Sequence, residues 1–244
     1  MKQLVGLQLY SLRDDFAKDY KDTLKRVSEL GFQGVEFAGF HDIPAKEMKE
    51  TLDLYNLKAA GSHTSYELLM EDLDGVIEYN KVIGNKYITC PWCSFPNEEA
   101  FEEIVHNFNQ IGKRLAEEGF TFSYHNHSHE FEKLGDAYIF DALFEACDVV
   151  TPELDVYWVY RGHENSVEYT KKYANAMNLL HLKDGNMETG TALGDGEVDI
   201  LGVLETVAKT DIEWVIVEDE TPYPNAFASV QKSAEYLKKE GYLN

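Results

Sequence analysis

The sequence has little cysteine, little positive charge and no long apolar run. Its 244 residues include only 3 cysteines, too few for a disulfide framework, which is typical of a protein from a reducing compartment. No window approaches the roughly eighteen apolar residues that a membrane span needs, and the apolar lead in residues 1–6 is too short for an export signal. These absences predict a soluble cytoplasmic protein with no membrane partner.

Positive charge is outweighed two to one by negative charge. Lys and Arg number 22 against 44 Asp and Glu, which gives a formal net charge of −22. Such a field repels phosphate backbones and attracts cations, so nucleic acid is excluded as a partner and a DNA-repair nuclease is disfavoured. The same charge weighs mildly against a phosphorylated substrate, although a few local Lys or Arg residues could override it.

Short β-branched and aromatic runs alternate with stretches of helical period, which is the pattern of βα units around a parallel sheet. Helices are predicted at 20–30, 45–55 and 98–118, the last with Asn97 as its N-cap. Glycines that would end helices stand at Gly31, Gly84, Gly119 and Gly241. Strands are predicted at 4–10, 34–39, 57–63, 86–91, 120–126, 152–158, 178–183 and 214–219.

Eight strands with about eight helices and no linker predict an α/β protein in which residues 1–244 form one (β/α)8 TIM barrel domain. A doubly wound open sheet is the rival architecture. That fold usually carries a Gly-rich phosphate turn after an early strand, and the run Tyr10-Ser-Leu-Arg-Asp14 that follows the first strand is not such a turn.

In a barrel, alternate side chains of each strand face the helices and the interior. On the predicted fifth strand Phe122 and Tyr124 take the outward phase, so His125 faces inward near the C-terminal end, where barrel enzymes hold their active sites. The same rule places other polar side chains inward on the remaining strands: Gln8, Tyr10, Glu36, Asp155, His181, Lys183 and Glu218.

Four of these side chains come from four consecutive strands and form a mixed nitrogen and oxygen set: His125, Asp155, His181 and Glu218. Such a set suits a divalent metal ion. Burying the two carboxylates together without a cation would cost several kcal/mol each. Taken singly, each residue has an ordinary explanation, such as a hydrogen-bonded core histidine or a surface carboxylate. Their common phase favours a metal site.

Cys90-Pro-Trp-Cys93 has the spacing of a redox motif. A strand-like run ends at Cys90 and no helix begins directly from it, so a redox function is the weaker interpretation. We expect one buried cysteine and one incidental neighbour.

The joint set of motifs resembles the sugar phosphate isomerase/epimerase family of xylose isomerase-like TIM barrels, which includes ketose 3-epimerases, inosose dehydratase and family 2 AP endonucleases. The resemblance covers essentially the whole chain. It rests on Gly6 to Asp14, Gly34 to Gly39, Gly61 to His63, Tyr124 to His127 with Glu130-Phe131, Glu153 to Trp158, His181 to Asp184, Leu193 to Gly196 and Val217-Glu218.

The resemblance implies one divalent ion (Mn, Co, Mg or Zn) held by a Glu, an Asp, a His and a second Glu. Asp155, His181 and Glu218 match the last three. The position of the first Glu falls on His125, and Glu130 is the only nearby carboxylate that could fold back instead. This departure puts the simple two-glutamate proton shuttle of the epimerases in doubt.

The first functional hypothesis is therefore a metal-dependent sugar isomerase or epimerase that acts on a keto-sugar or related polyol through an enediolate. A dehydratase or 3-keto-glycoside lyase on the same site is the nearest alternative, and a non-catalytic carbohydrate-binding barrel is a third. The expected partner is a small-molecule sugar, and a homo-oligomer is left open. The predicted catalytic residues are Glu218, His125, His127 and Lys183, and the predicted substrate-binding residues are Glu36, His63, Trp92, Asn126, Trp158 and Arg161.

Overall fold

Eight parallel strands close into a barrel in the computed structural model, which describes residues 3–222 and 224–243. Their order around the barrel is β1-β12-β9-β8-β5-β4-β3-β2. The strands are β1 (Leu4–Gln8), β2 (Gly34–Ala38), β3 (Lys58–His63), β4 (Tyr87–Cys90), β5 (Thr121–His125), β8 (Val150–Asp155), β9 (Leu179–Leu182) and β12 (Trp214–Val217). Each corresponds to one of the eight predicted strands, so the predicted (β/α)8 barrel is confirmed.

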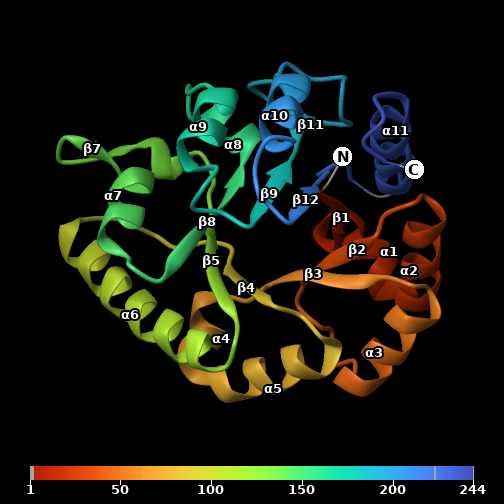
Figure 1. The fold of residues 1–244 in the computed structure, drawn as a ribbon, viewed down its shortest axis with the longest axis horizontal. Helices are drawn as coiled ribbons and strands as arrows, with labels where there is room; N and C mark the ends of the chain where they lie inside the picture. Colours follow the sequence, from red (N-terminus) through yellow and green to blue (C-terminus); the bar gives the residue numbers. More distant parts are fainter. Residues whose placement is uncertain (1–2, 223, 244) are drawn as a thin grey trace.

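Helices form an outer ring around the strands, as Figure 1 shows. They are α1 (Arg13–Lys18), α2 (Tyr20–Glu29), α3 (Ala45–Leu54), α4 (Tyr66–Glu71), α5 (Leu73–Ile83), α6 (Glu98–Glu117), α7 (Ile139–Ala146), α8 (Val156–Arg161), α9 (Ser166–Tyr173), α10 (Ile200–Val207) and α11 (Ala226–Lys239). Asn97 caps α6 as predicted, since its side chain accepts the Ala100 N–H at 2.9 Å. None of the helices in the described ranges is both long and apolar enough to cross a membrane.

Most predicted strands are too long at their C-terminal ends, and in two of them the extra residues form a helix. The sixth ends at Asp155 rather than at Trp158, because the Asp155 carboxylate accepts the N–H groups of Tyr157 at 2.9 Å and Trp158 at 3.0 Å and so caps α8. The first ends at Gln8, whose side chain accepts the Tyr10 N–H at 2.9 Å and starts the short 3-10 helix η1 (Leu9–Leu12). Tyr10 is therefore 44% exposed at the barrel mouth and does not face inward on a strand.

Smaller elements decorate the loops that follow two barrel strands. After β5 come the 3-10 helix η2 (His129–Phe131) and a hairpin of β6 (Lys133–Leu134) and β7 (Ala137–Tyr138). After β9 comes a hairpin of β10 (Asp184–Gly185) and β11 (Gly190–Thr191).

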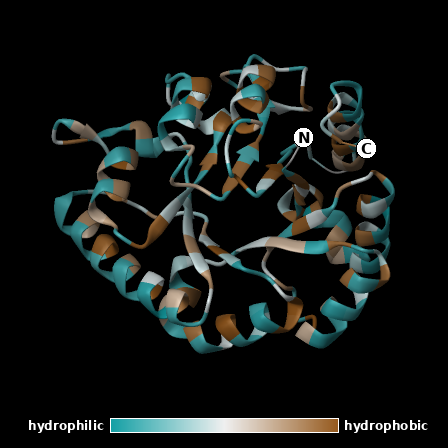
Figure 2. Ribbon diagram, in the orientation of Figure 1, coloured by the Kyte–Doolittle hydropathy of each residue, from teal (hydrophilic) through white to brown (hydrophobic). Residues whose placement is uncertain are grey.

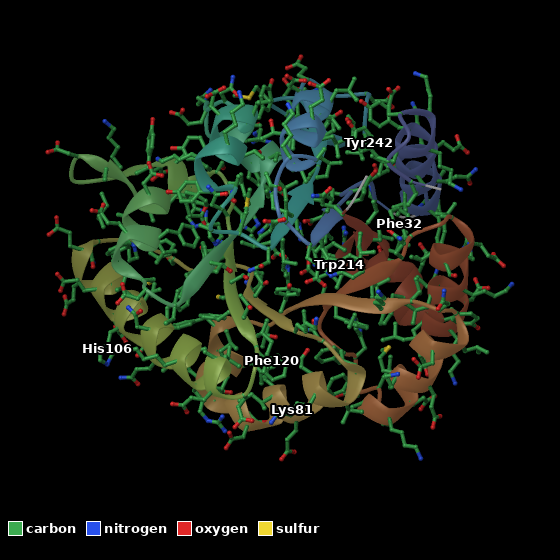
Figure 3. All side chains as sticks on the ribbon, viewed as in Figure 1. Phe32, Lys81, His106, Phe120, Trp214 and Tyr242 are labelled. Atoms are coloured by element: carbon green, nitrogen blue, oxygen red, sulfur yellow. The ribbon has the colours of Figure 1, made fainter. Side chains whose placement is uncertain are left out.

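Apolar side chains fill two layers, one between the helices and the barrel and one inside the barrel floor. In the outer layer Phe108 of α6 meets Phe122 of β5 with ring centroids 5.2 Å apart, while the outer helix faces are largely hydrophilic (Figure 2). In the floor Trp214 packs with Leu179 and Ile216, near the centre of the molecule in Figure 3. A Cβ at Gly34 would lie 2.6 Å from the Trp214 ring, so glycine is required there.

Candidate active site

Four predicted side chains converge at the C-terminal mouth of the barrel: His125 at the end of β5, Asp155 at the end of β8, His181 on β9 and Glu218 just after β12. One nitrogen or carboxylate oxygen from each lies within 4.8 Å of the others, and all four residues are buried. His181 Nδ1 is 2.9 Å from Glu218 Oε2. His125 Nε2 lies 3.5 Å from Asp155 Oδ2 and 3.8 Å from Glu218 Oε2.

Unsatisfied buried atoms in this cluster fit a divalent ion. Both ring nitrogens of His125 and Oδ2 of Asp155 are buried without a hydrogen-bond partner, an arrangement that costs free energy unless something else binds them. Burial lowers the pKa of His125 well below its ordinary value, and His181 and His63 lower it further. His125 is therefore a neutral imidazole with a lone pair to donate, and two imidazoles with two carboxylates are suitable ligands for Mn, Co or Zn.

Glu130 is turned away from the cluster. Its carboxylate is fully buried and accepts hydrogen bonds from the Tyr124 hydroxyl at 2.5 Å and from the His127 N–H at 2.8 Å. These contacts hold the turn that comes after β5. Of the two residues considered for the fourth position, His125 is the one that lies in the cluster.

His181 is oriented from below by Glu36. Its Nε2 lies 2.6 Å from Glu36 Oε2, which also accepts a hydrogen bond from Gln8 Nε2 at 2.8 Å. A carboxylate at one ring nitrogen fixes the tautomer and leaves the other nitrogen for a metal, so Nδ1 is directed at the cluster. Room for the carboxylate comes from Gly61, where a Cβ would lie 2.3 Å from Glu36 Oε1.

Glu153 was missed by the sequence reasoning. It lies two residues before Asp155, on the same inward phase, and is fully buried. His63 Nε2 lies 2.8 Å from its Oε2, and His181 Nε2 lies 3.6 Å from its Oε1. Burial alone would raise the pKa of Glu153, but His181 and His63 lower it to about 2. Alternation could have found this residue, since both carboxylates of Glu153-Leu-Asp155 share one face of the strand.

Both a carboxylate and a histidine of this lower layer bind protons more readily than usual, and burial together with Glu153 raises the pKa of Glu36 to about 7. Burial opposes the charged form of His181, yet Glu153 and Glu36 together with the hydrogen bond to Glu218 raise its pKa well above the ordinary value. Without a metal ion, His181 therefore carries protons on both ring nitrogens at neutral pH.

Lys183 supplies a buried positive charge beside the cluster. Its Nζ lies 2.8 Å from Glu220 Oε1 and 3.6 Å from Glu218 Oε1, and 4.7 Å from the centroid of the Trp158 ring. Burial would lower the pKa of Lys183, but Glu218 and Asp155 raise it above its ordinary value. Burial would likewise raise the pKa of Glu218, but Lys183 and His181 hold it well below its ordinary value. Lys183 is thus a cation and Glu218 an anion.

His127 lies at the wall of the same mouth. Its ring centroid is 5.1 Å from that of His125 and 5.1 Å from that of Trp158, and its Nδ1 has no hydrogen-bond partner. Burial, with His125 adding to it, lowers the pKa of His127 to about 3. The imidazole is therefore neutral at neutral pH and a weak base.

A cavity of about 920 Å³ opens above the cluster, and its lining includes His125, His127 and Glu218. Of the predicted substrate-binding residues, His63 and Trp92 also line it. The other four, Glu36, Asn126, Trp158 and Arg161, lie outside the cavity lining.

Glu36 and Asn126 are fully buried and support the cluster from behind rather than facing the cavity. Asn126 binds the backbone of Asp155, accepting its N–H at 2.9 Å and donating to its carbonyl at 3.3 Å. Trp158 and Arg161 lie on α8 outside the cavity lining, where the Arg161 guanidinium donates to the Tyr157 hydroxyl at 2.9 Å. Alternation predicts that a side chain points inward but not how deep it lies.

Cys90 and Cys93 are both buried, so both belong to the packed interior. Their sulfur atoms lie 3.7 Å apart and both are free thiols. The hydrogen bond to Cys90 and burial raise the pKa of Cys93 far above its ordinary value, which leaves almost no reactive thiolate.

The fold and the cluster together define a (β/α)8 barrel protein with a candidate metal site at the C-terminal mouth. The sequence matches the family described as Xylose isomerase-like TIM barrel over residues 24–240. The chain belongs to this family.

Its relatives carry several names. An inosose dehydratase from Clostridium botulinum is 22% identical, and the match covers 92% of this chain and 90% of that protein. A solved sugar phosphate isomerase/epimerase from Parabacteroides distasonis is 25% identical with a TM-score of 0.87, covering 100% of this chain and 96% of that one. The solved structure of a probable 3-DHS dehydratase from Bacillus anthracis has a TM-score of 0.77 at 14% identity, covering 97% and 99%, a likeness of fold alone.

Proposed function

We propose that this chain is a divalent-metal-dependent lyase that eliminates water or an alcohol from a keto-sugar or keto-polyol by way of an enediolate. The observation that carries the proposal is the buried cluster of His125, Asp155, His181 and Glu218, which holds unpartnered atoms of His125 and Asp155 and contributes His125 and Glu218 to the cavity lining. A divalent ion bound there would polarise a substrate carbonyl and make the neighbouring C–H bond acidic.

The chain supplies groups for each proton transfer. Glu218 and His127 both line the cavity, and Glu218, a carboxylate, is the group that would accept the proton α to the carbonyl, since the pKa of about 3 makes the neutral imidazole of His127 a weak base. Lys183 lies outside the cavity lining and is paired with Glu220 and Glu218, so its positive charge would favour negative charge on a substrate oxygen through space and not by direct contact. The buried layer below keeps these groups in place and excludes water from beneath.

Elimination is favoured over epimerisation by the chemistry of His125. A shuttle that takes a proton from one face of a carbon and returns it to the other needs two bases on opposite faces, and the resemblance assigns these to two glutamates. Here one of the two is a histidine. Elimination needs one base together with an acid near the leaving oxygen. Glu218 can act as the base, and a cationic or protonated neighbour can act as the acid. The curated relatives named inosose dehydratase support the same class of reaction.

Isomerisation or epimerisation is the second candidate, since the relative from Parabacteroides distasonis is named a sugar phosphate isomerase/epimerase. Both reactions begin with the same enediolate. They differ in its fate, because elimination expels a leaving oxygen whereas epimerisation and isomerisation return a proton to the intact skeleton.

Incubating the Mn-loaded protein with an inosose in deuterated water separates the candidates. Loss of water from the substrate, monitored by mass spectrometry and NMR, is the expected result. Solvent deuterium on an intact carbon skeleton would instead establish the second candidate. An inert Asp155→Ala variant beside an active Asp148→Ala variant, which changes an exposed Asp, would tie either activity to the cluster. Absence of both reactions with a range of keto-sugars and metals would overturn the proposal.

A further inference from the structure

The cavity is larger than a sugar ring needs. A keto-sugar has about 12 non-hydrogen atoms, which at the liquid-water value of about 30 Å³ each fill about 360 Å³. The cavity measures about 920 Å³, so a monosaccharide seated at the cluster would leave more than half of it free. This volume is typical of pockets that bind larger, drug-sized ligands.

The free part of the cavity is an apolar lobe on one side of the barrel mouth. Phe40 and Ile43 line it from the loop between β2 and α3, Leu68 from α4, and Val76 and Tyr79 from α5. The lobe is continuous with the part of the cavity that His125 and Glu218 line. A single ligand can therefore place its sugar at the cluster and another of its groups in the lobe.

Its walls are fixed in place. The rings of Phe40 and Tyr79 stack with centroids 3.8 Å apart, and the Tyr79 hydroxyl donates to the Ile43 carbonyl at 2.9 Å. Asp72, a carboxylate in this lining, accepts the Gly75 N–H at 3.0 Å as the cap of α5. At the rim Leu68 and Trp92 are 44% and 52% exposed, and such apolar surface beside a cavity marks a binding site.

The side chains that line the cavity are mainly acidic where they are charged. The cavity lining, among the residues that the structure describes, contains no Lys or Arg, whereas Asp42, Asp72, Glu218 and Glu220 belong to it. Lys183 is buried and occupied by Glu220 and Glu218. A phosphosugar would bring about two negative charges into a field that is already negative. The charges of the lining therefore favour an uncharged substrate over a phosphorylated one.

From these observations we infer that the substrate is an uncharged keto-glycoside whose apolar, aromatic-sized aglycone binds in the lobe lined by Phe40, Leu68 and Tyr79. This inference rests on the elimination proposed above and names its leaving group. The proton leaves the carbon between the carbonyl and the anomeric carbon. The electron pair that this proton leaves behind forms a double bond between that carbon and the anomeric carbon. The bond from the anomeric carbon to the aglycone oxygen breaks, and its electron pair goes to that oxygen, which takes up a proton. No oxidant or reductant is consumed.

The test compares three probes with the Mn-loaded full chain: phenyl 3-keto-glucoside, methyl 3-keto-glucoside and the 6-phosphate of the methyl compound. We expect kcat/KM for the phenyl compound to exceed that for the methyl compound by at least about tenfold, because the phenyl ring leaves water on binding. The phosphate should be the poorest of the three.

Leu68→Asp tests the lobe itself, and Met70→Asp is its matched control. Both residues lie on α4 and are exposed, at 44% and 51%, but only Leu68 lines the cavity. Leu68→Asp should remove most of the phenyl preference, measured as the ratio of kcat/KM for the two compounds, whereas Met70→Asp should leave that ratio unchanged. Equal rates for phenyl and methyl compounds, or a preference for the phosphate, would overturn the inference while leaving elimination intact.

Direct binding keeps the two proposals separable if no probe reacts. Phenyl β-glucoside, which has no keto group, should bind the wild-type protein at least about tenfold more tightly than methyl β-glucoside by calorimetry, and Leu68→Asp should abolish the difference. Inert probes with this binding pattern would reject the lyase and retain the lobe. No binding difference between the two glucosides would reject the lobe.

Discussion

Glu36→Gln should weaken metal binding without touching a metal ligand. Oε2 of Glu36 accepts from His181 Nε2 at 2.6 Å and from Gln8 Nε2 at 2.8 Å, both fully buried. A glutamine with its oxygen in that place keeps both contacts, so the barrel should fold. It loses the charge, and its amide nitrogen takes the place of Oε1, which has no hydrogen-bond partner.

The expected size of the effect comes from the loss of that charge. A hydrogen bond to a charged group contributes about 1.5–3 kcal/mol and one between neutral groups about 0.5–1.5 kcal/mol, so the variant loses on the order of 1–1.5 kcal/mol. At about 1.4 kcal/mol per factor of ten, Kd for the metal ion should rise about tenfold, within the range usual for carboxylates that orient a metal-bound histidine. Glu36 also raises the pKa of His181, and measuring at pH 8 reduces this competition from protons.

Calorimetric titration with Mn²⁺ and the visible spectrum of the Co²⁺ form are the assays. Glu213→Gln is the matched control, because Glu213 accepts a hydrogen bond from the Tyr87 hydroxyl at the opposite end of the barrel. It should leave Kd and spectrum unchanged. An unchanged Kd in Glu36→Gln, or equal effects in both variants, would refute the role assigned to Glu36.

Three further predictions concern the cluster and the barrel floor. Asp155→Ala and His181→Ala should each abolish stoichiometric metal content by elemental analysis, and full metal content in both would reject the cluster. Metal binding at pH 7 should release one proton, because the raised pKa of His181 leaves Nδ1 protonated in the free protein, and calorimetry in buffers of different ionisation enthalpy counts it. Burial raises the pKa of Asp155 to about 6, so Asp155 also takes up a proton as pH falls through about 6. The affinity for the metal ion should then drop more steeply. A constant affinity would contradict the assignment of Asp155 as a ligand. Gly34→Ala should destabilise the fold by about 1–3 kcal/mol in urea titration through overpacking, since its Cβ would lie 2.6 Å from Trp214. Gly190→Ala, whose Cβ would lie 3.7 Å from its nearest neighbour, should leave the free energy of unfolding nearly unchanged. Equal stability of the two variants would count against this packing.

The alternation of apolar and polar residues along the strands predicts the barrel and the direction of its polar side chains. It does so because both faces of each strand are buried, one against the helices and one inside the barrel. It fails at strand ends, where side-chain hydrogen bonds override propensity. Asp155 illustrates this: the β-branched and aromatic residues after it favour a strand, but its carboxylate caps a helix. A residue can therefore be a helix cap and a member of the cluster at once.

Depth inside the barrel is the second quantity that a period of two does not give. Glu36 and His125 share the inward phase, yet Glu36 lies below His181 and His125 lines the cavity. Which layer a side chain occupies depends on the stagger of neighbouring strands, including the register shift between Val35 and Glu36 opposite β3. Lobe residues such as Leu68 escaped prediction for a different reason, since they lie on helices and loops whose approach to the mouth is set by tertiary packing.

Anomalous diffraction from a crystal grown with Mn²⁺ tests the central claim most directly. The account predicts one strong peak at the barrel mouth, with His125, Asp155, His181 Nδ1 and Glu218 each at about 2.0–2.3 Å, the distances usual for such ligands. A peak bound elsewhere, or none at saturating Mn²⁺, would contradict it.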